Sequence, residues 1–226
     1  MENASTSHPA PSVQPSGPAQ TAAVPNAWPA MFAASLGQPG PTTRVRVAVD
    51  LDNLFLSLPY GDRLDFAVLL KTAATFGQIL DSRVYLGRHV GSPGERALPL
   101  ALKHAGFTHV ISRPFRIQPN GAKKSDIDVL LATDCIQDAL LNLYDVLYLC
   151  TGDSDYVPLV ERLVQYGKQV AVLGPVHATA WELTVASTHF CSVADVPGLV
   201  QGSGGSMGCA APGYPLGSAS MAAHAG

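Results

Sequence analysis

The sequence predicts an α/β fold: a three-layer sandwich with a mostly parallel central sheet, flanked by disordered arms. Short β-branched runs alternate five times with longer amphipathic runs in the middle of the chain. Parallel strands need crossover connections, and right-handed crossovers place helices on both faces of the sheet. Both flanks are rich in Pro, Ala, Ser and Gly, and hold few residues able to offset the entropy of ordering.

Each predicted strand is short and apolar, and a helix is expected after each one. The strands span 44–51, 82–87, 108–115, 145–150 and 169–174. The helices span 62–77, 94–106, 125–143, 155–167 and 178–187. Three of these helices end at Gly, which readily adopts the left-handed conformation of a helix C-terminus.

The composition divides the 226 residues into an arm (1–43), one domain (44–198) and a tail (199–226). All 14 Lys and Arg residues lie between Arg44 and Lys168, and the two flanks hold a single charged residue, Glu2. A net charge of -3 argues against a protein that coats nucleic acid by bulk charge. A local binding groove stays compatible with this charge.

Four cysteines occur without a CxxC or a Cys/His spacing, which excludes zinc-ribbon and redox motifs. The N-terminus has no basic segment followed by an apolar stretch, and no apolar run reaches the roughly 18 residues of a membrane span. These features predict a cytoplasmic protein that does not cross a membrane.

Carboxylates gather where predicted strands end and predicted helices begin. They are Asp50 and Asp52 after the first strand, Asp126 and Asp128 at the start of helix 125–143, and Asp153 and Asp155 after strand 145–150. In open parallel sheets, sites form beyond the carboxyl ends of the strands. Two carboxylates about 5 Å apart repel by roughly 3 kcal/mol at an effective dielectric of about 20. Such a cluster predicts raised pKa values or a shared divalent cation. Oxygen-only ligands favour Mg²⁺ or Mn²⁺, which suit phosphoryl chemistry.

Helix capping is the alternative explanation for several of these acids. Asp153 can cap the helix that follows it, and Ser125 with Asp128 forms an S-x-x-D pattern close to a capping box. Asp50 ends a central apolar strand where no helix is expected, so a functional role is favoured. Asp134 lies in mid-helix, where a buried, hydrogen-bonded structural role is expected.

Three motifs stand out in the domain. The strand-ending D-x-x-N-L includes Asp50 and Asn53; the helix-opening D-x5-D is Asp128 and Asp134, preceded by Lys124; and "TGDSDYVPLVERLVQYGKQVAVLG" spans 151–174. Together they resemble the NYN domains, a branch of the PIN-like ribonuclease superfamily with a Rossmann-like fold, over roughly 44–196. The family commonly has K-G-x-D or K-S-x-D before the helix, whereas "KKSDID" leaves Asp126 and Asp128 as alternatives here.

The resemblance implies a metal-dependent ribonuclease that hydrolyses RNA phosphodiesters with a cation-activated water in an acidic cleft. Its catalytic residues would be Asp50, Asp128, Asp153 and Asp155, which would hold Mg²⁺ or Mn²⁺ directly or through water. The substrate would be single-stranded RNA.

Substrate-positioning residues are expected around these acids. The resemblance implies that Asn53 and Ser154 orient water or phosphate. Lys123 and Lys124, just ahead of the acidic helix, are candidates for phosphate contact. Further basic candidates are Arg88, Arg113 and Arg116, each of which is also typical of a solvated surface.

Two other functions stay open. The stretch "DLDN" also resembles the D-x-D-x-[TV] motif of haloacid-dehalogenase-like phosphatases, with Asp50 as nucleophile and Asp52 as acid/base. Leu54 and Val157 depart from that pattern. The third function is a non-catalytic module that binds RNA or a protein. Metal-dependent degradation of single-stranded RNA would separate the nuclease from the binding module, and release of phosphate from small phosphomonoesters would indicate the phosphatase.

Overall fold

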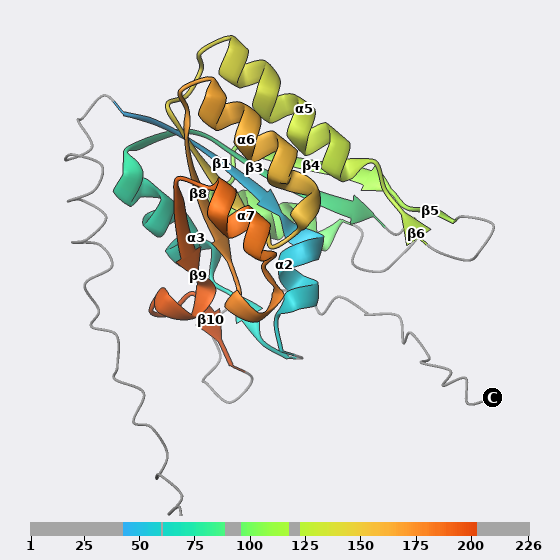
Figure 1. Ribbon diagram of the computed structural model, residues 1–226. Helices are drawn as coiled ribbons and strands as arrows, with labels where there is room; N and C mark the ends of the chain where they lie inside the picture. Colours follow the sequence, from blue (N-terminus) through green and yellow to red (C-terminus); the bar gives the residue numbers. More distant parts are fainter. Residues whose placement is uncertain (1–42, 60, 89–95, 118–122, 203–226) are drawn as a thin grey trace, which may run out of the picture.

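A computed structural model describes residues 43–59, 61–88, 96–117 and 123–202 (Figure 1). The predicted arms at 1–43 and 199–226 lie outside the described residues except for Thr43 and 199–202. In that last segment β10 (Val200–Gln201) pairs with β2 (Arg63–Leu64), so the described structure continues past the predicted boundary at 198.

The centre of the fold is a parallel sheet of six strands in the order β4-β3-β1-β7-β8-β9. The strands are β1 (Arg44–Asp50), β3 (Gln78–Arg88), β4 (His109–Pro114), β7 (Val146–Cys150), β8 (Gln169–Gly174) and β9 (His189–Ser192). The chain builds the sheet outward from β1 in one direction and then returns to β7 to build the other half. The junction of β1 and β7 is therefore the point where the strand order reverses, and such junctions are where open α/β sheets bind ligands.

Helices cover both faces of the sheet, as predicted (Figure 1). They are α2 (Leu51–Ser57), α3 (Phe66–Ala73), α4 (Ala97–His104), α5 (Ile127–Leu140), α6 (Val157–Gln165) and α7 (Trp181–Ala186). One buried cluster joins α2, α3 and α4 to the sheet, and a second joins α5, α6 and α7 to its other face. The three-layer fold class is thus confirmed.

The alternation of β1 assigns its side chains to the two faces. Val45, Val47 and Val49 are fully buried in the cluster with α2, α3 and α4. Arg46 and Asp50 alternate with these valines and are also buried, at 1% and 3% exposure. Because successive strand residues point to opposite faces, Arg46 and Asp50 lie on the face that α5, α6 and α7 cover.

Shorter elements connect these layers. They are the 3-10 turns η1 (Ala74–Phe76), η2 (Ser154–Tyr156), η3 (Val176–Ala178) and η4 (Val193–Asp195), and the hairpin of β5 (Arg116–Ile117) with β6 (Lys123–Lys124). Gly167, with φ of +74°, follows the end of α6 and adopts the left-handed conformation expected there. None of the helices in the described residues is long and apolar enough for a membrane crossing.

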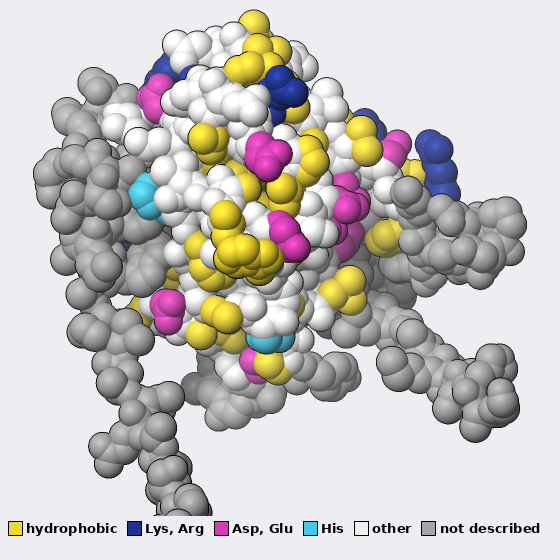
Figure 2. All heavy atoms as spheres, viewed as in Figure 1, with side chains coloured by type: hydrophobic (Ala, Val, Ile, Leu, Met, Phe, Trp, Pro, Cys, Tyr) yellow, Lys and Arg dark blue, Asp and Glu magenta, His cyan; other side chains and the backbone are white. Residues whose placement is uncertain are grey.

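The outer surface of the helical layer carries apolar side chains. In Figure 2, hydrophobic side chains gather over α7 and neighbouring α6 on the viewed face, with acidic side chains beside them. Trp181 and Val185 of α7 are 70% and 59% exposed, and Val164 of α6 is 42% exposed.

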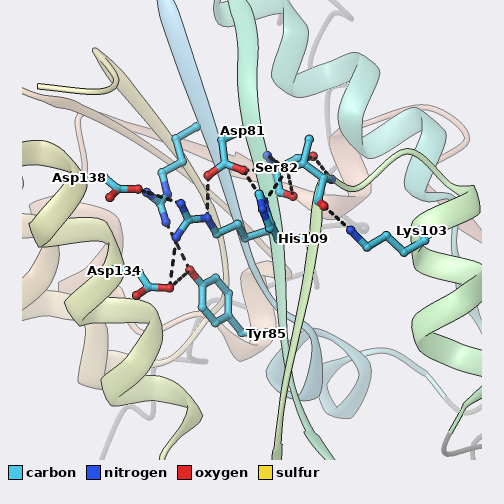
Figure 3. Close-up of polar contacts among 10 residues, drawn as sticks. Asp81, Ser82, Tyr85, Lys103, His109, Asp134 and Asp138 are labelled. Carbon is cyan, nitrogen blue, oxygen red and sulfur yellow. Dashed lines mark hydrogen bonds and ion pairs between the residues drawn. The ribbon is translucent and has the colours of Figure 1, made fainter. Parts of the chain in front are cut away.

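A polar network attaches α5 to the sheet (Figure 3). The buried Arg46 of β1 forms an ion pair with Asp138 of α5. Arg83 of β3 contacts Asp138 and Asp134 at 3.1 and 3.3 Å. The hydroxyl of Tyr85 donates to Oδ2 of Asp134 at 2.9 Å, so Asp134 has the hydrogen-bonded structural role that was expected, although it is half-buried. These contacts fix α5, and with it Asp128, relative to β1 and β3.

Candidate active site

The ends of β1 and β7 place two of the predicted acids close together. Val49 of β1 pairs with Cys150 of β7, so Asp50 and Thr151 follow at the same edge of the sheet. The hydroxyl of Thr151 donates to Oδ2 of Asp50 at 3.3 Å. The N–H of Asp153 donates to the same Thr151 oxygen at 3.2 Å. Thr151 therefore links Asp50 to the loop that carries Asp153.

Asp50 is also the N-cap of α2, which begins at the next residue. Its Oδ1 accepts from the N–H of Asn53 at 3.2 Å. The expectation that Asp50 has no helix to cap is therefore wrong. It failed because α2 follows β1 directly, without a Gly or Pro to mark the change from strand to helix.

Asp52 is a second acid at this position, in the first turn of α2. Its Oδ2 accepts from the N–H of Gly87, near the end of β3, at 2.6 Å. Asp52 was not among the predicted catalytic residues. The D-x-D spacing at the end of an apolar strand is the sequence signal that points to it.

Asp128 reaches the same edge from the first turn of α5. The capping box expected for Ser125 and Asp128 does not form: the Ser125 hydroxyl oxygen is buried without a hydrogen-bond partner. Asp128 Oδ1 instead accepts from the hydroxyl of Tyr156 at 3.3 Å. Asp126, the alternative ligand, is exposed and lies 3.9 Å from Arg116. Of these two aspartates, the structure thus places Asp128 with the other acids.

We call Asp50, Asp52 and Asp128 the acid cluster. Burial, with a smaller contribution from the charges of Asp128 and Asp52, raises the pKa of Asp50 to about 7 against the opposing hydrogen bonds of the Asn53 N–H and the Tyr156 hydroxyl. Burial also raises the pKa of Asp52 to about 6, and Asp128 adds to that shift while the Gly87 N–H opposes it. Burial is the main cause of both shifts, and repulsion from the neighbouring carboxylates adds to it.

Tyr156 supplies a neutral donor to the acid cluster. Its side chain is 2% exposed, and its hydroxyl interacts with both Asp50 and Asp128. Burial and these two carboxylates raise the pKa of the Tyr156 hydroxyl, so it stays protonated and donates. Tyr156 lies within the 151–174 motif, but the contact of its hydroxyl with acids from β1 and α5 was not foreseen from the sequence.

The other predicted catalytic acid, Asp155, lies on the same turn as Asp153. Oδ1 of Asp153 accepts from the N–H of Asp155 at 2.9 Å, which makes Asp153 the N-cap of η2. Ser154 and Asp155 are exposed. The structure thus brings Asp50 and Asp128 together, connects Asp153 to them through Thr151, and leaves Asp155 at the solvent-facing side of the turn.

The predicted positioning residues lie around this edge. Oδ1 of Asn53 accepts from the N–H of Gly152 at 2.7 Å and so ties α2 to the loop after β7. Lys123 and Lys124 form β6, the strand that leads into α5. Arg113 and Arg116 are exposed on the β4 to β5 segment.

The donor chemistry of the acid cluster fits a hard dication. All its potential ligands are carboxylate oxygens, Asp50 is buried while Asp52 and Asp128 are half-buried, and their mutual repulsion would fall on cation binding. Within the described residues, no three His, Cys, Asp or Glu side chains are arranged to hold one ion. Mg²⁺ needs only one or two carboxylates because it keeps several of its waters.

Comparison with known proteins gives a consistent result. Residues 44–194, about two thirds of the chain, match the family model of the NYN domain. A solved structure of a protein of unknown function from Vibrio parahaemolyticus is similar, with a TM-score of 0.60 and 26% identity. The similarity covers 69% of this chain and 96% of that one. No curated protein matches the chain significantly.

Proposed function

This chain belongs to the NYN domain family, and from that premise we propose that it is a metal-dependent ribonuclease that hydrolyses phosphodiester bonds of single-stranded RNA. NYN domains are generally ribonucleases. Asp50 and Asp128 of the acid cluster would hold Mg²⁺ or Mn²⁺, with Asp153 and Asp155 contributing through water. The three cysteines of the described residues are buried and free, which supports action in the reducing cytoplasm.

One observation carries the proposal: the acid cluster unites carboxylates from two distant segments where the strand order reverses. Asp50 and Asp52 come from the junction of β1 and α2, and Asp128 comes from α5. Helix capping explains one contact of Asp50, but it does not explain why Asp128 lies near enough to raise the pKa of Asp50. A site that binds a cation does explain it, because the ion needs converging negative oxygens.

The acid cluster and the residues around it would have different roles in hydrolysis. When bound, the ion would supply an activated water and neutralise charge on the phosphodiester. Tyr156 holds Asp128 by its hydroxyl and so orients one ligand. Asp52 binds the Gly87 N–H with one oxygen, and its second oxygen would accept a proton from the attacking water. Ser154 and Asn53 would orient water or phosphate, while Lys123 and Lys124 would contact the phosphates of the strand.

Cleavage of labelled single-stranded RNA tests this proposal. We expect Mg²⁺-dependent cleavage that stops in EDTA and falls roughly 10²-fold or more in Asp50→Asn and Asp128→Asn. Asp65→Asn is a matched control, because Asp65 caps α3 by accepting from the N–H groups of Ala67 and Val68. Undiminished cleavage in EDTA, or in both cluster variants, would contradict the proposal.

A non-catalytic RNA-binding or protein-binding module is the second candidate. It is favoured by the fact that no three-residue metal group occurs in the described part of the chain. RNA binding by the wild-type protein without any metal-dependent cleavage would identify this function. Release of phosphate from small phosphomonoesters would instead indicate the phosphatase chemistry suggested by "DLDN".

A further inference from the structure

The segment between β8 and α7 is fixed against the loop that carries Asp153. The N–H of Ala180 donates to the carbonyl of Gly152 at 2.9 Å. His177 in η3 contacts the carbonyl of Ser57, at the end of α2, through Nε2 at 3.1 Å. The segment therefore bridges the loop after β7 and the helix after β1.

Two glycines allow this segment to approach the sheet edge closely. A Cβ at Gly152 would lie 2.3 Å from the carbonyl oxygen of Ala178, which is closer than packing allows. A Cβ at Gly174 would lie 2.4 Å from Oγ1 of Thr179. Residues 178–180 are thus seated directly on the ends of β7 and β8, and the start of α7 is held in place before any ligand binds.

This fixed segment presents an exposed indole. Trp181, the first residue of α7, is 70% exposed, whereas Leu183 of the same helix is fully buried and anchors it. Val185 lies one turn further along the same face and is 59% exposed. Figure 2 shows the resulting hydrophobic patch over α7 with acidic side chains beside it. The contacts of the core therefore do not account for a tryptophan at this position.

We propose that Trp181 is a stacking platform for an unpaired base of the RNA bound at the acid cluster, an inference that rests on the function proposed above. Trp181 follows Ala180, and Asp153 follows Gly152, the two residues joined by a backbone hydrogen bond. With Cα atoms about 3.8 Å apart along the chain, the Cα atoms of Trp181 and Asp153 lie within about 15 Å of each other, and Thr151 connects Asp153 to the acid cluster. A single strand of a few nucleotides spans that distance.

Base stacking is compatible with the charge of this surface. The chain has a net charge of -3, and Glu182, next to Trp181 in α7, is exposed, so phosphates are not attracted to this surface and a strand that reaches it needs another contact. Stacking on an aromatic ring needs no charge and tolerates any base.

The test measures cleavage kinetics of the full chain on single-stranded RNA. Trp181→Ala should raise KM about tenfold and leave kcat within about twofold, because a stacked base contributes equally to substrate and transition state. Trp181→Phe should retain most of the affinity, and Val185→Ala, on the same exposed face, is the matched control. Circular dichroism should show unchanged folding, since the indole is largely exposed.

Two further comparisons separate the possible outcomes. In RNA whose bases are removed near the cleaved bond, wild type and Trp181→Ala should have equal KM values. Removal of the indole in Trp181→Ala should also leave the salt dependence of KM unchanged, because no phosphate contact is removed. If the wild type cleaves RNA and Trp181→Ala has the same KM, the stacking inference is overturned while the proposed function stands. If the wild type binds without cleaving, the dissociation constant replaces KM; if it neither binds nor cleaves, both proposals fall.

Discussion

Replacing Asp50 by Asn should stabilise the metal-free protein at neutral and alkaline pH. Burial and two neighbouring acids raise the pKa of Asp50 from 3.8 to about 7. Each unit of this rise corresponds to about 1.4 kcal/mol, so the ionised carboxylate costs up to about 4 kcal/mol of folding free energy at pH 8. Asn removes the charge and keeps an oxygen for the Asn53 N–H, but its amide would face the hydroxyls of Thr151 and Tyr156. We therefore expect a net gain of about 1–3 kcal/mol.

The pH dependence of this gain distinguishes charge repulsion from other effects. Between about pH 4 and pH 7 the folded wild type keeps a proton on Asp50 that the unfolded chain releases, so wild-type stability falls as the pH rises. The advantage of Asp50→Asn should accordingly shrink by up to about 1.4 kcal/mol per unit as the pH is lowered through this range. Asp81 and Asp145 have lowered pKa values, so they make both proteins more stable as the pH rises. Most of this contribution cancels when the unfolding free energy of the wild type is subtracted from that of the variant.

Urea unfolding in EDTA at several pH values measures this difference. Asp65→Asn again serves as the control, because it makes the same substitution at a helix N-cap outside the acid cluster. If Asp50→Asn were less stable than the wild type at pH 8, or if its effect did not vary with pH, the reasoning about the cluster would be refuted.

Two further predictions address the contacts around the cluster. Tyr156→Phe removes the hydroxyl that donates to Asp128 and should lower the rate of RNA cleavage about tenfold while the fold is retained. Initial rates and circular dichroism measure these two effects. An unchanged rate would show that the hydroxyl has no role in cleavage. Arg46→Met removes the buried partner of Asp138 but leaves Arg83 beside it, so it should cost less in urea unfolding than the roughly 3–5 kcal/mol of a fully broken buried pair. Arg46→Met combined with Asp138→Leu should cost less than Arg46→Met alone. A double variant at least as unstable as the sum of the single ones would contradict this account of the network.

Much of the fold follows from local pattern. The alternation of strand and helix, the parallel sheet and the coverage of both faces were predicted because they depend on runs of apolar residues. β9 was missed because "HFCS" is short, lies at the sheet edge and has polar residues at both ends. α2 was missed because "VAVDLDNLF" passes from strand to helix without a turn residue.

The candidate site was predictable only where a motif marked it. Asp50 and Asp128 were identified from strand-end and helix-start positions, and these two acids do lie together. Asp52 was placed with the strand-end acids but received a catalytic role only in the phosphatase alternative, because the contact that orients it is with the N–H of Gly87, 35 positions along the chain. The hydroxyl of Tyr156 joins the site through tertiary packing that no spacing in the sequence encodes.

The most direct test of the central claim is an anomalous-difference map from crystals of the full chain grown with Mn²⁺. The account predicts a peak between the carboxylates of Asp50 and Asp128, partly coordinated by water, and its loss in crystals of Asp50→Asn. Mn²⁺ bound only elsewhere, or a peak unaffected by Asp50→Asn, would contradict a cation site at the acid cluster.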